Sequence, residues 1–108
     1  MSQLKVLQVI DTLNIGGAER VLVNLSNLLI THGIDISVVQ ITTPGPLSAE
    51  LHPDVRQFSL NRKYRLSPSA FIRLIRLIHN HTIVHVHMRY NFLYVMLACS
   101  LAMVNKKA

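Results

Sequence analysis

The chain has 108 residues, of which 50% are hydrophobic and 15% charged, with only four glycines and four prolines. This composition excludes a disordered or fibrous chain, and the length suits a single domain with one core. The single cysteine, Cys99, excludes an internal disulfide and indicates a reducing compartment. The N-terminal apolar run is short and interrupted by Gln8, which argues against a signal peptide and favours a cytoplasmic protein.

The formal net charge of +6 is unevenly distributed along the chain. Residues 1–54 hold all five acids against two bases, and residues 55–108 hold nine bases and no acid. Such asymmetry suggests a basic surface that faces an anionic partner, although a basic half that is merely solvated fits equally well.

The first half of the chain alternates strand and helix patterns. A β-branched apolar run at 5–10 predicts a strand buried on both faces. Residues 18–32 predict an amphipathic helix, ended by Gly33. Its expected buried stripe consists of Ala18, Val21, Leu22, Leu25, Leu28 and Leu29. A second strand is expected at 34–41 and a loop at 42–46.

The second half continues the alternation. A short third strand is expected at 55–60, followed by a basic linker at 61–66. Ser67 and Pro68 predict a helix start. That helix buries Phe71, Leu74, Ile75 and Ile78. A fourth strand is expected at 82–87 and a final apolar helix at 90–104, which is shorter than the ~20 residues that span a bilayer.

Strands that alternate with helices predict parallel strands joined by crossover connections. The expected fold class is therefore α/β, a Rossmann-like parallel sheet with helices on both faces. In such folds ligands bind outside the carboxyl ends of the strands.

A glycine pair, Gly16 and Gly17, lies in the first strand-to-helix turn, at that edge. A helix N-terminus offers free backbone N–H groups to an anion, and glycine lets a ligand approach closely. The alternative is a tight turn that glycine merely permits. The glycine spacings of the dinucleotide fingerprint and of the P-loop are both absent, which argues against a nicotinamide enzyme or an NTPase.

Two stretches carry a resemblance to a known family: NIGGAERVLVNLSNLLITHGIDISVVQI (14–41) and TIVHVHMRYNFLYVMLAC (82–99). They resemble the N-terminal domain of family 4 retaining glycosyltransferases, whose two Rossmann-like domains form the GT-B arrangement. The resemblance implies that residues 1–108 are an incomplete, acceptor-side N-terminal domain, and that the C-terminal domain that holds the donor is absent. It implies a nucleotide-sugar as substrate and no cofactor.

The resemblance also implies roles for individual residues. Gly16 and Gly17 would lie near the diphosphate and sugar of the donor, with Glu19 and Arg20 starting the helix beyond them. The acceptor side would be lined by His87, Arg89 and Asn91.

Each role has a simpler alternative. Glu19 favours the dipole of any helix start, and Arg20 fits a solvated helix position. Asp11, after the first strand, is the best-placed carboxylate, and the alternative is that it only caps the loop. Of His85 and His87 we expect at most one to face a ligand, and we assign that role to His87 because strand ends face ligands.

A two-histidine metal site is not expected, since no third ligand lies nearby in the sequence. Five basic residues could form a surface that docks on an anionic membrane. The simpler interpretation, which we favour, is that they are only solvated. They are Arg62, Lys63, Arg65, Arg73 and Arg76. Specific nucleic-acid binding is not expected, because no tryptophan or recognition motif accompanies the charge.

The functional prediction is a glycosyltransferase domain that acts on a sugar or lipid acceptor only together with its missing C-terminal domain. The predicted location is the cytoplasm, peripheral at the inner face of the membrane. The alternative is a non-enzymatic module that docks on a partner or membrane. We also expect the isolated chain to be inactive and, because one sheet edge is unpaired, to be marginally stable or to self-associate.

Overall fold

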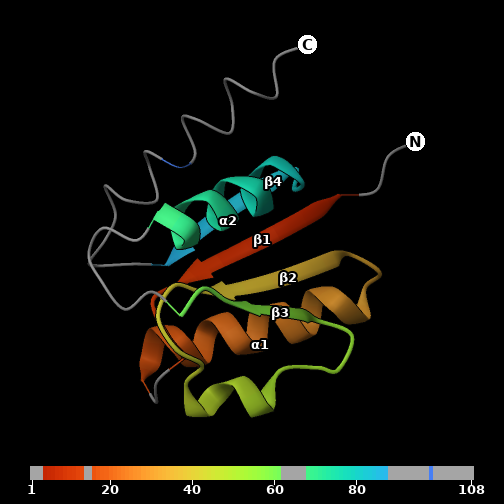
Figure 1. The fold of residues 1–108 in the computed structure, drawn as a ribbon. Helices are drawn as coiled ribbons and strands as arrows, with labels where there is room; N and C mark the ends of the chain where they lie inside the picture. The colour runs from red at the N-terminus through yellow and green to blue at the C-terminus, as the bar shows by residue number, and fades with distance from the viewer. Residues whose placement is uncertain (1–3, 14–15, 62–67, 88–97, 99–108) are drawn as a thin grey trace.

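The structure is a computed structural model that describes residues 4–13, 16–61, 68–87 and 98 (Figure 1). Strands and helices alternate along the described chain, as the sequence predicts. The elements are β1 Lys5–Ile10, α1 Gly17–Thr31, β2 Asp35–Gln40, the 3-10 helix η1 Pro46–Glu50, β3 Arg56–Ser59, α2 Pro68–His79 and β4 Ile83–His87.

The four strands form one parallel sheet in the order β3-β2-β1-β4. The register pairs Ile10 with Gln40 on one side and with His87 on the other. The chain first winds from β1 toward β2 and β3 and then returns to place β4 on the other side of β1. This reversal makes the boundary between β1 and β4 the switch point at which ligands bind in open α/β sheets.

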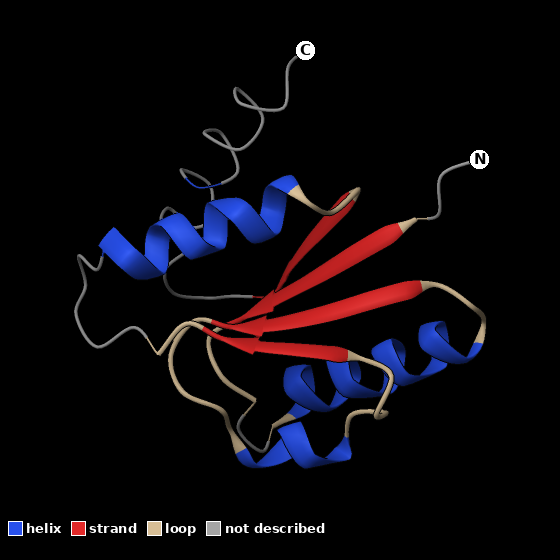
Figure 2. Ribbon diagram, turned by 45° about the vertical axis from the view of Figure 1, so that its right-hand side comes forward, coloured by secondary structure: helices blue, strands red, loops and turns tan. Residues whose placement is uncertain are grey.

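Helices cover both faces of the sheet: α1 and η1 lie on one face and α2 on the other (Figure 2). Side chains alternate across β1, so Val6 and Ile10 join the core under α1, whereas Leu7 and Val9 join the core under α2. The predicted Rossmann-like α/β fold is therefore confirmed. None of the described helices is long and apolar enough to cross a membrane.

The buried side of α1 differs from the prediction. Leu22 is buried as expected, but Val23 and Ser26 are buried as well, while Val21 and Leu28 are 60% and 56% exposed. The reason is that η1 packs beside α1 and the contact shifts the covered stripe toward it. Asn27 shows this directly, because its amide donates to the carbonyl of Glu50 in η1 over 2.9 Å.

The predictions for the other helices have different outcomes. In α2, Leu74 and Ile78 are buried, and Phe71 and Ile75 pack against the same core, as predicted. The helix η1 was not predicted. The expected helix at 90–104 lies outside the described residues except for Ala98, which is helical and fully buried under α2.

Helix α1 ends in a Schellman motif around Gly33. The N–H groups of Gly33 and Ile34 donate to the carbonyls of Ile30 and Leu29, at 3.1 and 3.2 Å. Gly33 has a φ of +82°, the left-handed region that favours glycine. A Cβ at this position would meet nothing within 4 Å, so the requirement for glycine is one of backbone conformation alone.

We expect Gly33→Ala to lower the free energy of unfolding by about 1–2 kcal/mol, the cost of a left-handed L-residue. Urea denaturation of the chain measures this change. Gly17→Ala is the matched control, because its Cβ also enters open space but its φ is not positive. Equal losses in the two variants would contradict the conformational explanation.

Candidate functional site

The candidate site lies at the carboxyl edge of the sheet, where the loops after β1 and β2 are tied together. The carbonyl of Asp11 accepts hydrogen bonds from both the N–H and the Oγ1 of Thr42, at 3.0 and 2.9 Å. Thr12 Oγ1 donates to the carbonyl of Thr43 over 2.7 Å. The two loops therefore form one braced unit, and Asp11, which is half-buried, contributes through its backbone.

A buried glutamine at the end of β2 holds the loops after β1 and β2 in place. Gln40 is 2% exposed, and its Oε1 accepts from the backbone N–H of Leu13 at 2.8 Å and of Gly45 at 2.9 Å. Its Nε2 donates to Ser48 Oγ at 2.9 Å. One side-chain amide thus connects the loop after β1, the loop after β2 and the helix η1. We call this arrangement the Gln40 clamp.

At Gly45 the loop after β2 lies directly against the backbone of Leu13. A Cβ at Gly45 would lie 2.4 Å from the backbone carbon and oxygen of Leu13, which no real side chain can do. The N–H of Leu47 also donates to the Leu13 carbonyl, over 2.9 Å. The two loops are therefore in backbone contact, and only glycine fits between them.

The glycine pair at the start of α1 has no comparable packing requirement among the residues that the structure describes. Gly16 is the N-cap residue, with an extended backbone (φ −176°) that any residue adopts. A Cβ on Gly17 would meet nothing within 4 Å, and one on Gly16 would meet only the carboxylate end of Glu19, 2.7 Å away. Gly16 is a favourable N-cap residue, and packing against the described residues requires neither glycine, which favours the interpretation that something outside the described residues approaches the backbone here.

The two charged residues of the first turn of α1 have local partners. The half-buried Glu19 folds its carboxylate back over Gly16 at the positive end of the helix. Arg20 is exposed and forms an ion pair with Glu50 of η1. Arg20 therefore helps to hold η1 against α1. No observation assigns either residue to a ligand.

On the other side of β1, His87 ends strand β4 with its ring on the α1 face of the sheet. Its Nε2 lies 2.8 Å from Oε1 of Gln8 and 3.1 Å from Nδ1 of His85. Because an amide oxygen can only accept, Nε2 of His87 carries the proton, and Nδ1 is the acceptor of the neutral ring. His85 is exposed, and both histidines share one face. Arg89 and Asn91 lie outside the described residues.

The environment of His87 favours its neutral form. Burial lowers the pKa of the imidazole below the usual 6.5, and the neighbouring His85 lowers it further. Gln8, 1% exposed, holds the ring, and its own Nε2 has no hydrogen-bond partner among the described residues. Within those same residues, no three His, Cys, Asp or Glu side chains gather in a way that could hold a metal ion.

Sequence reasoning missed both glutamines. Gln8 and Gln40 are polar residues within apolar strand runs, KVLQVI and DISVVQ, and that interruption was the available signal. A buried polar side chain needs partners, so such a residue indicates a fixed hydrogen-bond network.

Comparison with known proteins identifies the family of the chain. Residues 15–106 match the family model described as Glycosyltransferase Family 4. The chain belongs to this family, and its Rossmann-like domain supports a glycosyltransferase-type function. No curated protein and no solved structure gives a significant match.

We expect Gln40→Leu to lower the free energy of unfolding by about 2 kcal/mol or more, because two backbone N–H groups at Leu13 and Gly45 lose their acceptor. Gln57→Leu is the matched control. Gln57 is exposed on the neighbouring strand and donates one 3.3 Å bond to the Ser48 carbonyl, so its loss costs less than about 0.5 kcal/mol. Urea denaturation compares the two variants, and similar losses would count against the clamp.

The lowered pKa of His87 predicts a pH dependence of stability. Between that lowered value and 6.5, the unfolded chain binds more protons than the folded one, so the free energy of unfolding rises with pH. The contribution is present above 6.5 and is lost as the pH falls through the folded pKa. NMR titration measures the pKa directly, and His87→Gln should flatten the stability profile more than His32→Gln, an exposed control. A His87 midpoint at or above 6.5 would refute this prediction.

Proposed function

We propose that this chain is the acceptor-side N-terminal domain of a retaining glycosyltransferase, which moves a sugar from a nucleotide-sugar donor to a lipid-linked, polysaccharide or small-molecule acceptor. The observation that carries the proposal is the glycine pair at the start of α1. It lies at the carboxyl edge beside the switch point, and neither glycine is needed by the packing of the described protein.

The proposed role of this edge is to hold the donor diphosphate. Gly16 and Gly17 begin a 15-residue helix whose dipole places a partial positive charge there, and the diphosphate would take the place of the Glu19 carboxylate that lies over Gly16. When the sugar leaves, negative charge develops on the diphosphate, and fixed N–H donors stabilise it without rearrangement. A Cβ at Gly17 would occupy the space through which the phosphate oxygens approach.

On the acceptor side we propose His87, with Arg89 and Asn91. His87 is next to Ile10 across the β1–β4 boundary, and its Nδ1 is free to accept because Nε2 donates to Gln8. A neutral histidine can orient an acceptor hydroxyl group by accepting its proton in a hydrogen bond.

We further propose that a C-terminal domain outside this sequence holds most of the donor nucleotide, so the chain alone does not transfer sugar. The proposed location is the cytoplasmic face of the membrane. The excess of bases in residues 55–108 supports an approach to an anionic surface.

Gly17→Ala should leave the fold intact and weaken donor binding. The methyl group enters space that is open in the protein, so the free energy of unfolding stays equal or rises. Dissociation constants for UDP-glucose and GDP-mannose, taken from backbone amide shifts in NMR, should rise about fivefold or more, the equivalent of one hydrogen bond of ~1 kcal/mol.

Ser69→Ala, an exposed change in the first turn of α2, is the control and should bind like the unmodified chain. In the unmodified chain we expect the shifts to concentrate on the amides of Gly16, Gly17 and Glu19. Unchanged affinity in Gly17→Ala, or shifts confined to another edge of the sheet, would overturn the proposed donor site.

A further inference from the structure

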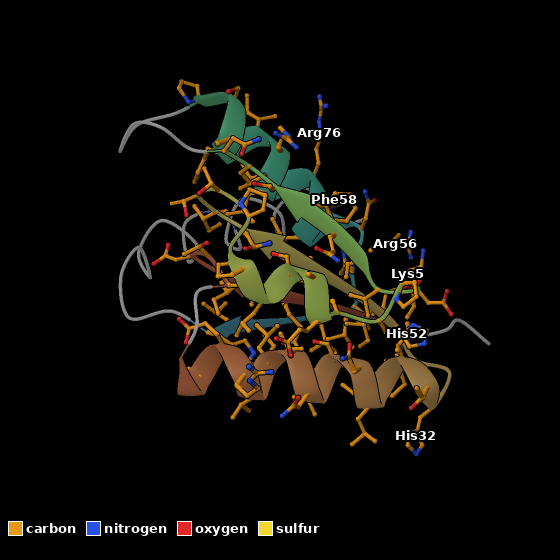
Figure 3. All side chains as sticks on the ribbon, turned by 90° about the horizontal axis from the view of Figure 1, so that it is seen from below. Lys5, His32, His52, Arg56, Phe58 and Arg76 are labelled. Carbon is orange, nitrogen blue, oxygen red and sulfur yellow. The ribbon has the colours of Figure 1, made fainter. Side chains whose placement is uncertain are left out.

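A small open pocket of about 250 Å³ lies between the outer strand β3 and helix α2, on the face of the sheet that α2 covers. Its lining joins two guanidinium groups, an amide and two apolar side chains. The residues are Phe58, Arg73, Arg76, Leu77 and Asn80. Figure 3 shows Phe58 and Arg76 on the same side of the molecule, with Arg56 and Lys5 displaced toward the start of β1. We call it the β3–α2 pocket.

The two arginines of this pocket have no carboxylate partner in the described protein. Arg73 Nη2 donates to the carbonyl of Ser59 over 3.2 Å, which holds its guanidinium at the pocket while its other N–H groups stay available. Arg76 lies about one helical turn further and is exposed, and its guanidinium forms no hydrogen bond or ion pair with a described residue. Two like charges three residues apart on a helix repel each other, and an anion bound between them would remove this repulsion.

No acid forms an ion pair with Arg73 or Arg76 among the residues that the structure describes. Residues 55–108 contain no acid at all. Of the described acids, Glu50 pairs with Arg20, and Asp54 lies close to His52. Asp35 holds Arg56 with two bonds of 2.7 and 2.6 Å, so this neighbouring cation of β3 is already neutralised.

The other residues that line the pocket indicate which organic group would carry the anion. Phe58 and Leu77 pack against the core under α2 and present an apolar wall, and Asn80 offers both a donor and an acceptor. Arginine forks match the oxygens of a phosphate, and the apolar wall suits the organic part of an ester. The volume is below the ~300–1,000 Å³ of pockets for drug-sized ligands, which favours a small ester over a nucleotide-sugar.

We propose that the β3–α2 pocket binds a phosphate ester, with the phosphate between Arg73 and Arg76 and the ester group against Phe58 and Leu77. The same chemistry is found in a free sugar or glycerol phosphate and in the headgroup of an anionic phospholipid. The pocket is separate from the donor site. Asn80 follows the last turn of α2, just before Thr82 pairs with Lys5 at the edge where the strands begin, whereas Gly16 and Gly17 lie at the opposite edge. The inference therefore stands independently of the proposed transferase function.

The test uses the 108-residue chain with two probes. Glycerol 3-phosphate is titrated by NMR, and vesicles of phosphatidylglycerol are compared with vesicles of phosphatidylcholine by sedimentation. We expect saturable binding of at least one phosphate probe, with shifts at the amides of Phe58, Leu77 and Asn80. Binding should weaken about tenfold or more in Arg73→Gln/Arg76→Gln, because two charge-assisted contacts are lost.

Lys5→Gln/Arg56→Gln removes the same number of positive charges outside the pocket and is the matched control, expected to bind within about twofold of the unmodified chain. Arg76→Gln alone breaks no side-chain hydrogen bond or ion pair with a described residue, so it tests the pocket even if the double variant is unstable. Binding of glycerol 3-phosphate alone indicates a free ester, and binding of anionic vesicles alone indicates a lipid headgroup; either supports the pocket. Equal weakening in the two double variants, unchanged binding in Arg76→Gln, or no binding of either probe at low salt would overturn it.

Discussion

The geometry of the candidate site depends on the Gln40 clamp. At the carboxyl edge the strand ladder has ended, so the N–H groups of Leu13 and Gly45 need acceptors that strand pairing no longer provides. Gln40 supplies one oxygen to both. It can do so because side chains alternate along β2: Val38 and Gln40 lie on the α1 face, and the last residue of the strand is directly beneath the two loops. The positions of Leu13 and Gly45 at this edge follow from this contact.

A second glutamine has the equivalent role on the other side of β1. Gln8 lies in the middle of the central strand and holds the ring of His87 at the end of β4. The two amides thus fix the two sides of the switch point. Gln40 holds the loops after β1 and β2, and Gln8 holds the ring of His87. Buried amides that are fixed at one or more atoms hold backbone and rings more rigidly than apolar contacts do, since hydrogen bonds restrict orientation as well as distance. An edge prepared in this way suits a site that must present fixed donors to a charged ligand.

Periodicity predicted most of the fold but little of the site. The apolar runs give the four strands, the two described helices and their alternation, and the alternation gives a parallel sheet. The spacing of apolar residues in α1 could not show which side of the helix is covered. The periodicity does not predict η1, and Val21 and Val23 are equally apolar. The clamp was hidden for a related reason. Gln40 bonds to residues 27 and 5 positions away, and such contacts exist only once the loops are in place.

The four glycines separate structural from functional requirements. Gly33 is explained by its positive φ, and Gly45 by the backbone of Leu13 against it. Gly16 and Gly17 are explained by neither, since Gly16 is extended and both Cβ positions meet open space or the movable end of Glu19. Gly16 is a favourable N-cap residue, whereas Gly17 inside the first turn costs conformational entropy relative to alanine, and packing against the described residues does not require it. That loss is offset only if the bare backbone contacts something else, and at the N-terminus of α1 the contact that the backbone favours is an anion.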